Sequence, residues 1–457
     1  MKTTLFPLIG VALIGTALMA GGFISSAFAQ NATGQKRVYP GFETLPQHQH
    51  HQLERKRTEL APGIFAFVGY GSSNFGVVTT KNGYILIDTG DDLNRAAEAL
   101  KQIKELTPGE LQAIILTHSH PDHRGGFEVF LEGRKDVPVW GHIDFGTEQK
   151  NGKGLEKVLG ERFDKQFGTG IPDDRFTRNF MTPRFPDGKP ARGRLATPDK
   201  FFVDEKTLMT IDGVTLEIYM IPGETADHVA IWLPDQKVLF PGDHVYGSFP
   251  NIYPIRGGGY RDVERWAKAV RRLMEFKPNA VMFGHNSVPD GDAILPLLEN
   301  YANAMEYVYE ETIRGMNEGK TADELAVSVR LPDTLRGEPY LGEFYGAVAW
   351  AVREIFAAKI GWFDGNPTNL VPLAPIEEAE RMAALAGGGE QLVRQAQTAL
   401  RNEDYRWAAL LADHLVHLGE TTEGRRIKAD ALDGISRDIL PISGKNYLQR
   451  SAIDLRK

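Results

Sequence analysis

The stretch Thr117-His118-Ser119-His120-Pro121-Asp122-His123 decides the fold of this chain, because three histidines and one aspartate directly follow an apolar run. The run, residues 111–116, is typical of a buried strand, so the polar side chains stand just beyond a strand end. Imidazole suits zinc, and a neighbouring carboxylate suits a hard or borderline divalent ion. The stretch therefore predicts a metal-binding loop rather than a chance group of surface histidines.

Three later segments carry further candidate ligands in the same setting. They are Pro222-Gly223-Glu224-Thr225, Pro241-Gly242-Asp243 and Gly284-His285-Asn286, and each follows a strand-like run. Loops at strand ends can converge on one point of a rigid scaffold. We therefore expect these residues to join the first loop in one site.

The composition excludes several classes of partner and of metal ligand. The chain has 457 residues, 42% hydrophobic and 25% charged, which is ordinary for a globular protein of two or three domains. A formal charge of -8, with no segment dense in lysine and arginine, argues against a nucleic-acid partner. Cysteine is absent, so neither disulfides nor thiolate ligands are available, and any metal is held by histidine and carboxylate.

Residues 1–29 have the pattern of a secretory signal peptide. Lys2 is followed by an apolar run and by the small-residue site Ala27-Phe28-Ala29. We expect a periplasmic or secreted protein with no stable membrane insertion after cleavage; an uncleaved anchor is the alternative. Residues 30–60 form an N-terminal linker, in which residues 47–52 are either a solvated, histidine-rich segment or a weak metal binder.

Residues 61–300 alternate between strand and helix patterns. Strand-like runs at 64–69, 76–80, 84–87 and 111–116 enclose a helical pattern at 91–106, and a hairpin is predicted at 210–218, followed by strands at 229–233 and 237–240. One domain of sheets flanked by helices is expected. Residues 146–200 are rich in glycine, proline and charge, which indicates an extended insertion that borders the site or an arm that reaches another subunit.

Residues 301–457 have helical periodicity instead. Helices are predicted at 299–317, 342–359, 376–385, 390–401 and 405–418. The last of these form pairs, which are too few to indicate a repeat array. An all-α second domain is expected.

The order His-x-His-x-Asp-His, Pro-Gly-x-Thr, Gly-Asp and Gly-His resembles the metallo-β-lactamase fold superfamily. The resemblance implies an α/β fold, the metallo-β-lactamase αββα sandwich, and a site for two Zn2+ ions. It also implies the ligand sets: His118 and His120 on the first zinc, Asp122, His123 and His285 on the second, and Asp243 between them. Zinc-bound hydroxide would be the nucleophile.

Glu224 narrows the resemblance, because the superfamily usually has histidine after Pro-Gly. Alkyl sulfatases of this fold use glutamate there, whereas lactamases, lactonases and glyoxalase-II-like thioesterases use histidine. Glu224 is then the third ligand of the first zinc. His228 is the competing ligand, or else a group behind the ligands.

Two further features resemble the alkyl sulfatases. Asn251 and Arg256 stand at offsets where that family binds the sulfate, with Arg261 behind them, and a guanidinium fork suits a tetrahedral anion. Residues 339–346 and 361–370 resemble the family's dimerisation domain, which implies a homodimer. The sterol-carrier-like C-terminal domain of longer members is not expected in this chain.

Two departures from the family pattern bear on mechanism. Asp243 stands where glutamate is typical, which shortens the bridge but keeps its charge. Trp350 lies in a segment where many members have a histidine that assists the leaving group. The general acid is therefore open, and the catalytic candidates are Asp122, His228 and Tyr253.

The predicted function is a dizinc hydrolase that cleaves a small-molecule alkyl sulfate ester to an alcohol and inorganic sulfate. Attack at sulfur and attack at carbon both fit these motifs. The alternatives are another hydrolase of the same fold, acting on a lactam, lactone, thioester or phosphoester, and a non-catalytic assembly module.

Overall fold

The computed structural model describes residues 53–172, 174–176, 181, 191–419 and 421–457. The predicted signal peptide, the histidine-rich segment and most of the predicted linker lie outside these residues. All described residues belong to one compact unit that spans 39–457. Within the described part, no helix is both long and apolar enough to cross a bilayer.

The first sheet has seven strands in chain order. They are β1 (Lys56–Ala61), β2 (Ile64–Val68), β3 (Phe75–Thr79), β4 (Gly83–Ile87), β5 (Glu110–Ile115), β6 (Val139–His142) and β7 (Lys200–Phe202). β1 to β4 pair antiparallel, and β4 to β7 pair parallel. Parallel neighbours need a crossover, and α2 (Leu93–Leu106) provides the one between β4 and β5. Asp92 caps that helix by accepting a hydrogen bond from the Arg95 amide at 2.8 Å.

The second sheet has five strands in the order β12-β11-β10-β9-β8. They are β8 (Lys206–Ile211), β9 (Val214–Met220), β10 (Val229–Leu233), β11 (Val238–Gly242) and β12 (Ala280–Phe283). The predicted hairpin at 210–218 is confirmed as β8 and β9, which pair antiparallel. β11 and β12 are parallel, and α6 (Val263–Glu275) crosses between them.

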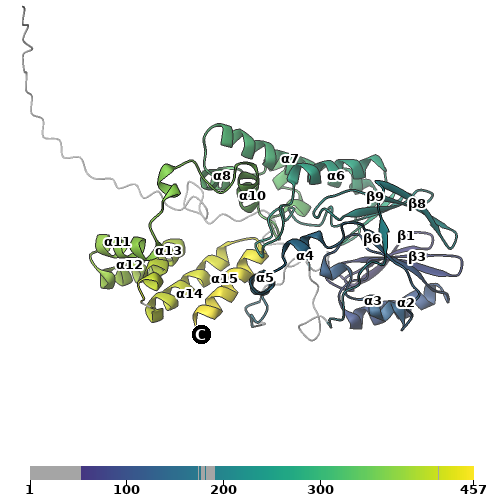
Figure 1. Ribbon diagram of the computed structural model, residues 1–457, viewed down its shortest axis with the longest axis horizontal. Coiled ribbons are helices and arrows are strands. Elements are labelled where there is room, and N and C mark those ends of the chain that lie inside the picture. The colour runs from purple at the N-terminus through teal and green to yellow at the C-terminus, as the bar shows by residue number, and fades with distance from the viewer. Residues whose placement is uncertain (1–52, 173, 177–180, 182–190, 420) are drawn as a thin grey trace, which may run out of the picture. The chain divides into compact units, whose positions relative to one another are not determined.

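The two sheets face each other across a dry core. Ile85 and Ile87 of the first sheet and Ile231 and Phe240 of the second are all fully buried in one cluster. α2 and α3 (Phe127–Leu131) cover the outer face of the first sheet, and α6 and α7 (Ile294–Asn317) cover the second. Figure 1 shows the strands between these helical layers. The predicted four-layer α/β sandwich is confirmed.

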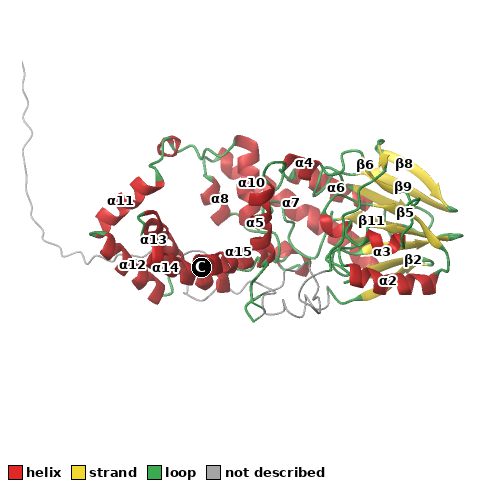
Figure 2. Cartoon of the chain, turned by 60° about the horizontal axis from the view of Figure 1, so that its bottom comes forward, coloured by secondary structure: helices red, strands yellow, loops and turns green. Residues whose placement is uncertain are grey.

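The chain after β12 is helical in the described residues, as Figure 2 shows. The remaining α-helices are α8 (Ala322–Ser328), α9 (Asp333–Arg336), α10 (Val348–Ile360), α11 (Pro375–Ala386), α12 (Gly389–Arg401), α13 (Tyr405–His417), α14 (Thr421–Asp438) and α15 (Ile442–Leu455). Short 3-10 turns are η1 (Pro121–His123), η2 (Gly291–Ala293), η3 (Pro339–Leu341) and η4 (Pro367–Leu370). The five helices predicted beyond residue 298 are all present as α7, α10, α11, α12 and α13.

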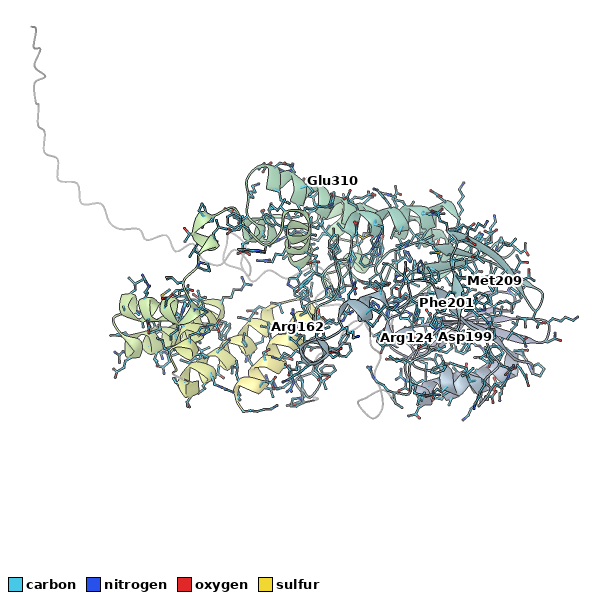
Figure 3. All side chains as sticks on the ribbon, viewed as in Figure 1. Arg124, Arg162, Asp199, Phe201, Met209 and Glu310 are labelled. Atoms are coloured by element: carbon cyan, nitrogen blue, oxygen red, sulfur yellow. The ribbon has the colours of Figure 1, made fainter. Side chains whose placement is uncertain are left out.

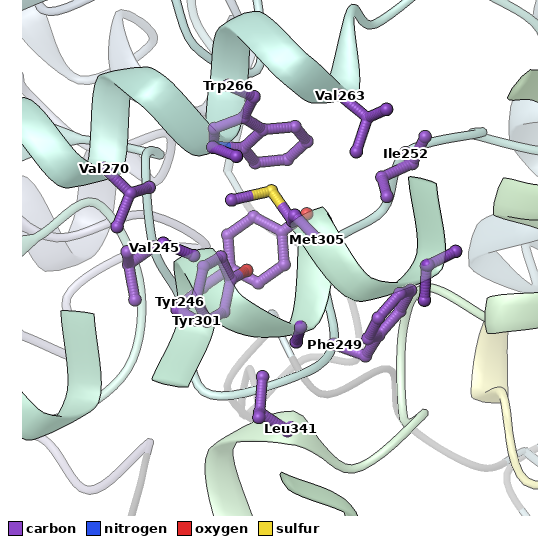
Figure 4. Packing of buried hydrophobic residues seen from close by; sticks show 14 of the residues in the cluster. Val245, Tyr246, Phe249, Ile252, Val263, Trp266, Val270, Tyr301, Met305 and Leu341 are labelled. Atoms are coloured by element: carbon purple, nitrogen blue, oxygen red, sulfur yellow. The ribbon is translucent and has the colours of Figure 1, made fainter. Parts of the chain in front are cut away.

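One apolar cluster joins the helical part to the second sheet. Figure 4 shows Tyr246 and Phe249, from the loop after β11, packed with Trp266 of α6 and Met305 of α7. Leu341 of η3 belongs to the same cluster. The loop that follows β11 is therefore fixed from several sides by buried contacts.

The described beginning of the insertion at 146–200 borders the site, which is one of the two predicted alternatives. It contains α4 (Thr147–Asn151) and α5 (Glu156–Phe167). Gln149 of α4 accepts a hydrogen bond from Ser119 Oγ at 3.1 Å and donates one to the Ser119 carbonyl at 3.3 Å. These bonds place α4 directly on the histidine-rich loop.

Candidate metal and active site

The predicted metal ligands converge, because each follows the end of a strand that points toward the same edge of the sandwich. The structure gathers them in two groups of potential ligands: His118, His120, Glu224 and Asp243 in one, and Asp122, His123 and His285 in the other. Within each group the ligand atoms lie within 4.8 Å of one another. His228 belongs to neither group.

Asp243 faces both groups. Its Oδ2 lies 3.0 Å from His285 Nε2 and 3.8 Å from His118 Nε2. Its Oδ1 lies 3.3 Å from His123 Nε2. The shorter aspartate side chain therefore still reaches both sides of the site.

The backbone and neighbouring side chains orient three of the imidazoles. His123 Nδ1 lies 2.9 Å from Asp88 Oδ2, His285 Nδ1 donates to the Ser72 carbonyl at 2.8 Å, and His118 Nδ1 lies 3.0 Å from Thr117 Oγ1. Each contact occupies Nδ1, so that Nε2 faces into the cluster. Outer partners of this kind fix the ring orientation of metal-binding histidines.

Four buried polar atoms of the cluster have no hydrogen-bond partner within the described residues: His118 Nε2, His123 Nε2, Glu224 Oε2 and Asp243 Oδ1. Burying such an atom unsatisfied costs about 1–3 kcal/mol. All four are lone-pair donors that face one another, which is the donor set that a divalent cation satisfies. The residues present thus fit a metal, and the cluster is a divalent-metal site.

Gly284 is the residue that lets the cluster close. A methyl group at this position would overlap Asp243 Oδ1 and would lie 2.8 Å from His123 Cε1. We expect Gly284→Ala to lower the free energy of unfolding by about 1–3 kcal/mol, because the methyl group overpacks the site. Metal affinity should fall with it. Thermal unfolding and metal content measure both effects, and Gly259→Ala, where no atom lies within 4 Å of the added methyl, is the matched control.

Glu224 is paired on its other oxygen. Glu224 Oε1 forms a buried ion pair with Arg261 Nη1, and the same Nη1 donates to the Asn251 carbonyl at 2.9 Å. Burial lowers the pKa of Arg261, but the charges of Glu224 and Glu148 outweigh it and raise the pKa above its ordinary value. Arg261 thus contacts a metal-ligand candidate and the loop at 251, and its predicted substrate-binding role stays a prediction.

The other two predicted substrate residues stand on the loop after β11. Asn251 is buried, and its amide donates to the Tyr246 hydroxyl at 2.6 Å. The Arg256 amide donates to Gln166 Oε1 at 2.8 Å, and its guanidinium Nη2 lies 3.5 Å from Glu148 Oε1. Arg256 is therefore fixed at its backbone and held beside the metal cluster at its tip.

Tyr253 points toward α5. Its hydroxyl accepts a hydrogen bond from Arg162 Nη2 at 3.4 Å, and Arg162 also donates to the Ile255 carbonyl at 2.8 Å. Figure 3 labels Arg162 on α5. The catalytic role predicted for Tyr253 stays a prediction, and its observed role is to help anchor the loop that carries Arg256.

His228 is enclosed by the protein. Its ring stacks on that of His118 with centroids 4.0 Å apart, and its Nε2 accepts a hydrogen bond from the Asp243 amide at 3.3 Å. Its Nδ1 lies 2.8 Å from Thr225 Oγ1, which donates to Asp227 Oδ1. Burial, followed by the charge of His244, lowers the pKa of His228 well below 6.5. This geometry suits a residue that positions Asp243, and the catalytic role predicted for His228 stays a prediction.

The sequence did not single out Tyr345. This buried residue has its hydroxyl 3.5 Å from Gln166 Nε2. Burial raises the pKa of Tyr345 to about 12, with opposing contributions from Arg256 and Glu224. Gln166 joins this phenol to the Arg256 amide, which donates to Gln166 Oε1. By contrast, the Trp350 ring lies against α15, where a methyl group on Gly444 would come within 3.0 Å of it.

The chain matches two family models. Residues 68–285 match the metallo-β-lactamase superfamily, and residues 321–457 match the alkyl sulfatase dimerisation family. The chain joins a metallo-β-lactamase domain to an alkyl sulfatase dimerisation domain. All seven predicted metal ligands fall within the metallo-β-lactamase domain.

Relatives of the two-domain chain carry sulfatase names. A linear primary-alkylsulfatase of Pseudomonas sp. is 28% identical over 390 residues, which cover 83% of this chain and 73% of that protein. An (R)-specific secondary-alkylsulfatase of Pseudomonas sp. is 26% identical and an alkyl/aryl-sulfatase of Saccharomyces cerevisiae is 25% identical. This chain spans 62% and 64% of the length of these two relatives.

A solved structure shares the fold. A double mutant of the sec-alkyl sulfatase PisA1 superposes with a TM-score of 0.80 at 25% sequence identity. The match covers 94% of this chain and 72% of that one. The metallo-β-lactamase domain and the helical dimerisation domain therefore occur together in a known structure.

Proposed function

We propose that the protein hydrolyses alkyl sulfate esters to an alcohol and inorganic sulfate. The observation that carries the proposal is Arg256, a guanidinium fixed beside the metal cluster in a chain that also has an alkyl sulfatase dimerisation domain. Named alkylsulfatases align with 83% to 87% of this chain. A carboxylate-paired arginine near a cation site suits a substrate that carries a sulfate group.

We further propose two zinc ions as the metal. His118, His120 and Glu224 would hold one, Asp122, His123 and His285 the other, and Asp243 would contact both. When bound, such ions lower the pKa of a water molecule toward 7 and polarise the oxygen of the ester. The donor set of imidazoles and carboxylates, without thiolate, supports zinc among the divalent metals.

The chain's own residues then perform binding, orientation and proton transfer. Arg256 and Asn251 bind and orient the sulfate, while Arg261 holds Glu224 and the Asn251 carbonyl in place. Buried Tyr345, whose hydroxyl is joined through Gln166 to the Arg256 amide, is the group we propose to donate a proton to the leaving oxygen. A Tyr345→Phe variant that keeps full turnover on esters of poorly acidic alcohols would contradict that role.

The proposal is tested by sulfate release from a panel of primary and secondary alkyl sulfates with zinc-loaded protein. We expect release, and we expect Arg256→Ala to lower kcat/KM by about 10- to 100-fold, the loss of a charge-assisted hydrogen bond of about 1.5–3 kcal/mol. A β-lactam and a lactone serve as counter-substrates. Hydrolysis of either without any sulfate release would overturn the proposal.

A homodimer is the proposed assembly. The segment 360–376, within the matched dimerisation domain, exposes Ile360, Trp362, Leu370, Val371, Leu373 and Ile376, with Trp362 75% and Val371 86% exposed. Apolar surface of this density marks an interaction site. We expect Trp362→Ser with Val371→Ser to shift the sedimentation coefficient from dimer to monomer, whereas Leu208→Ser, at an exposed site on β8, should not.

The periplasmic or secreted location is likewise a proposal. It rests on the signal-peptide pattern at residues 1–29. N-terminal sequencing of the mature protein tests it, and a chain that retains Met1 would contradict it.

A further inference from the structure

The imidazole of His120 lies between two carboxylates that come from different parts of the chain. Its Nε2 lies 3.1 Å from Oε2 of Glu148, on α4, and its Nδ1 lies 3.6 Å from Oε2 of Glu224, in the loop after β9. The other three histidines of the cluster present Nε2 to the metal site, but His120 presents Nδ1. This reversed orientation of the His120 ring requires a partner for Nε2, the nitrogen that faces away from the metal site. Glu148 contacts that nitrogen.

The second oxygen of Glu148 contacts the substrate loop. Glu148 Oε1 lies 3.5 Å from Arg256 Nη2, and a methyl group on Gly258 would come within 2.8 Å of the same oxygen. The Glu148 side chain is 20% exposed and that of Arg256 is 16% exposed. One carboxylate thus reaches a metal-ligand candidate with one oxygen and the sulfate-binding candidate with the other.

Glu148 does not pack in the hydrophobic core. None of the five residues of α4 is buried, and the helix is held on the histidine loop by the Gln149 to Ser119 bonds and by Gly146, whose amide donates to Asp227 Oδ2 at 3.0 Å. Polar contacts with the histidine loop and with Arg256 therefore set the position of Glu148.

We propose that Glu148 is a positioning residue that couples the metal site to the sulfate site. Through Oε2 it accepts the Nε2 proton of His120 in a hydrogen bond, which leaves the Nδ1 lone pair for the metal. Through Oε1 it holds the Arg256 guanidinium in the position where it meets the anion. The second half of this inference rests on the proposed sulfatase function, whereas the first half rests on the metal cluster alone.

The test compares Glu148→Ala and Glu148→Gln with Glu161→Gln, an exposed residue of α5 that loses the same charge. Zinc affinity is measured by competition with a chelator, without reference to activity. We expect Glu148→Ala to weaken zinc binding by about 10- to 100-fold, the range found when an outer partner of a metal-binding histidine is lost. Glu148→Gln should lose much less, because the amide oxygen still accepts from His120. Glu161→Gln should match the wild type.

The proposed contact of Glu148 with Arg256 is tested by the steady-state kinetics of an alkyl sulfate. Glu148→Gln should raise KM by about tenfold, the loss of about 1.4 kcal/mol in substrate binding, with a smaller change in kcat. In an Arg256→Ala background the same change should raise KM no further, because the residue it positions is absent. An equal additional rise in KM in that background would overturn the link to Arg256.

The outcomes separate the two ideas. Unchanged zinc affinity in Glu148→Ala, in protein that still releases sulfate, overturns the inference and leaves the proposed function standing. Absence of sulfate release from the wild type overturns the proposed function, while the order of zinc affinities still tests the hold on His120. Should Glu148→Ala fail to fold, a zinc affinity of Glu148→Gln below that of Glu161→Gln by more than about tenfold would overturn the inference, because a neutral acceptor should suffice.

Discussion

Stripping the metal is expected to abolish the hydrolysis of alkyl sulfates. Metal catalysis of this kind supplies several kcal/mol of transition-state stabilisation, so activity should fall on the order of a thousandfold or more after dialysis against a chelator. Zinc should restore it, with recovery that saturates near two ions per chain if both predicted ligand groups bind. Sulfate release and metal content, measured on the same samples, check this. Full activity in protein that contains almost no metal would contradict it.

Zinc affinity should depend on pH, because protons and zinc compete for the ring nitrogens of the ligand histidines. Burial lowers the pKa of His123, but Asp243, Asp122 and Asp88 outweigh it and raise the pKa well above 6.5. Protonation of His123 therefore stabilises the metal-free fold below the unfolded pKa of about 6.5, and that stabilisation is lost as pH rises through the higher folded pKa. Zinc needs the unprotonated ring and binds more tightly over the same rise.

The melting temperatures of the metal-free and the zinc-loaded protein measure this competition between protons and zinc. The metal-free protein should lose stability as pH rises above about 6.5, whereas the zinc-loaded protein should hold or gain stability. The gap between the two melting temperatures is therefore expected to widen with pH. At His118 zinc has no proton to displace near neutral pH, because burial and the neighbouring histidines lower the pKa of His118 well below 6.5. A gap that narrows as pH rises would contradict the assignment of His123 as a ligand.

The grouping of the candidate metal ligands could be predicted because chemistry and position coincide in the sequence. His118, Asp243 and His285 each follow an apolar run, and the fold brings the ends of β5, β11 and β12 to one edge. Arg261 shows where this reasoning stops. Its guanidinium suits a sulfate, and in the structure it pairs with buried Glu224, 37 residues away in the chain, a contact that no sequence pattern indicates.

The fold likewise has parts that the sequence predicts and parts that it does not. The strands of the sandwich have apolar runs with turn residues between them, and the observed β2 to β5 lie within about one residue of the predicted positions. α5 was not predicted, although Leu159, Phe163 and Phe167 stand at helical spacing, because glycine and charged residues dominate the segment and only Gln166 of the helix is buried. The contacts that matter there, Arg162 to the loop at 255 and Gln166 to Arg256, are polar and have no periodic pattern. Glu148 was missed for the same reason.

Loss of Arg261 is expected to cost more stability than any other single charge change around the site. The Arg261 side chain is 3% exposed and that of Glu224 is 4% exposed, so Arg261→Met leaves a buried carboxylate without its partner. Breaking a buried pair in this way typically costs about 3–5 kcal/mol. We expect a loss of that size in the free energy of unfolding of the metal-free protein, measured by denaturant titration.

Three companion measurements tie that loss to the pair rather than to the removal of an arginine. Arg353→Met breaks an exposed pair with Asp323 and should cost about 0–1 kcal/mol. Adding Glu224→Gln to Arg261→Met should recover part of the loss, because the unpaired charge is removed. Zinc should also recover part of it, since a cation on Glu224 Oε2 replaces the charge that Arg261 supplied to Oε1. Equal losses in Arg261→Met and Arg353→Met would mean that the Glu224 carboxylate is satisfied without Arg261, and the position of Glu224 in the metal cluster would then need another support.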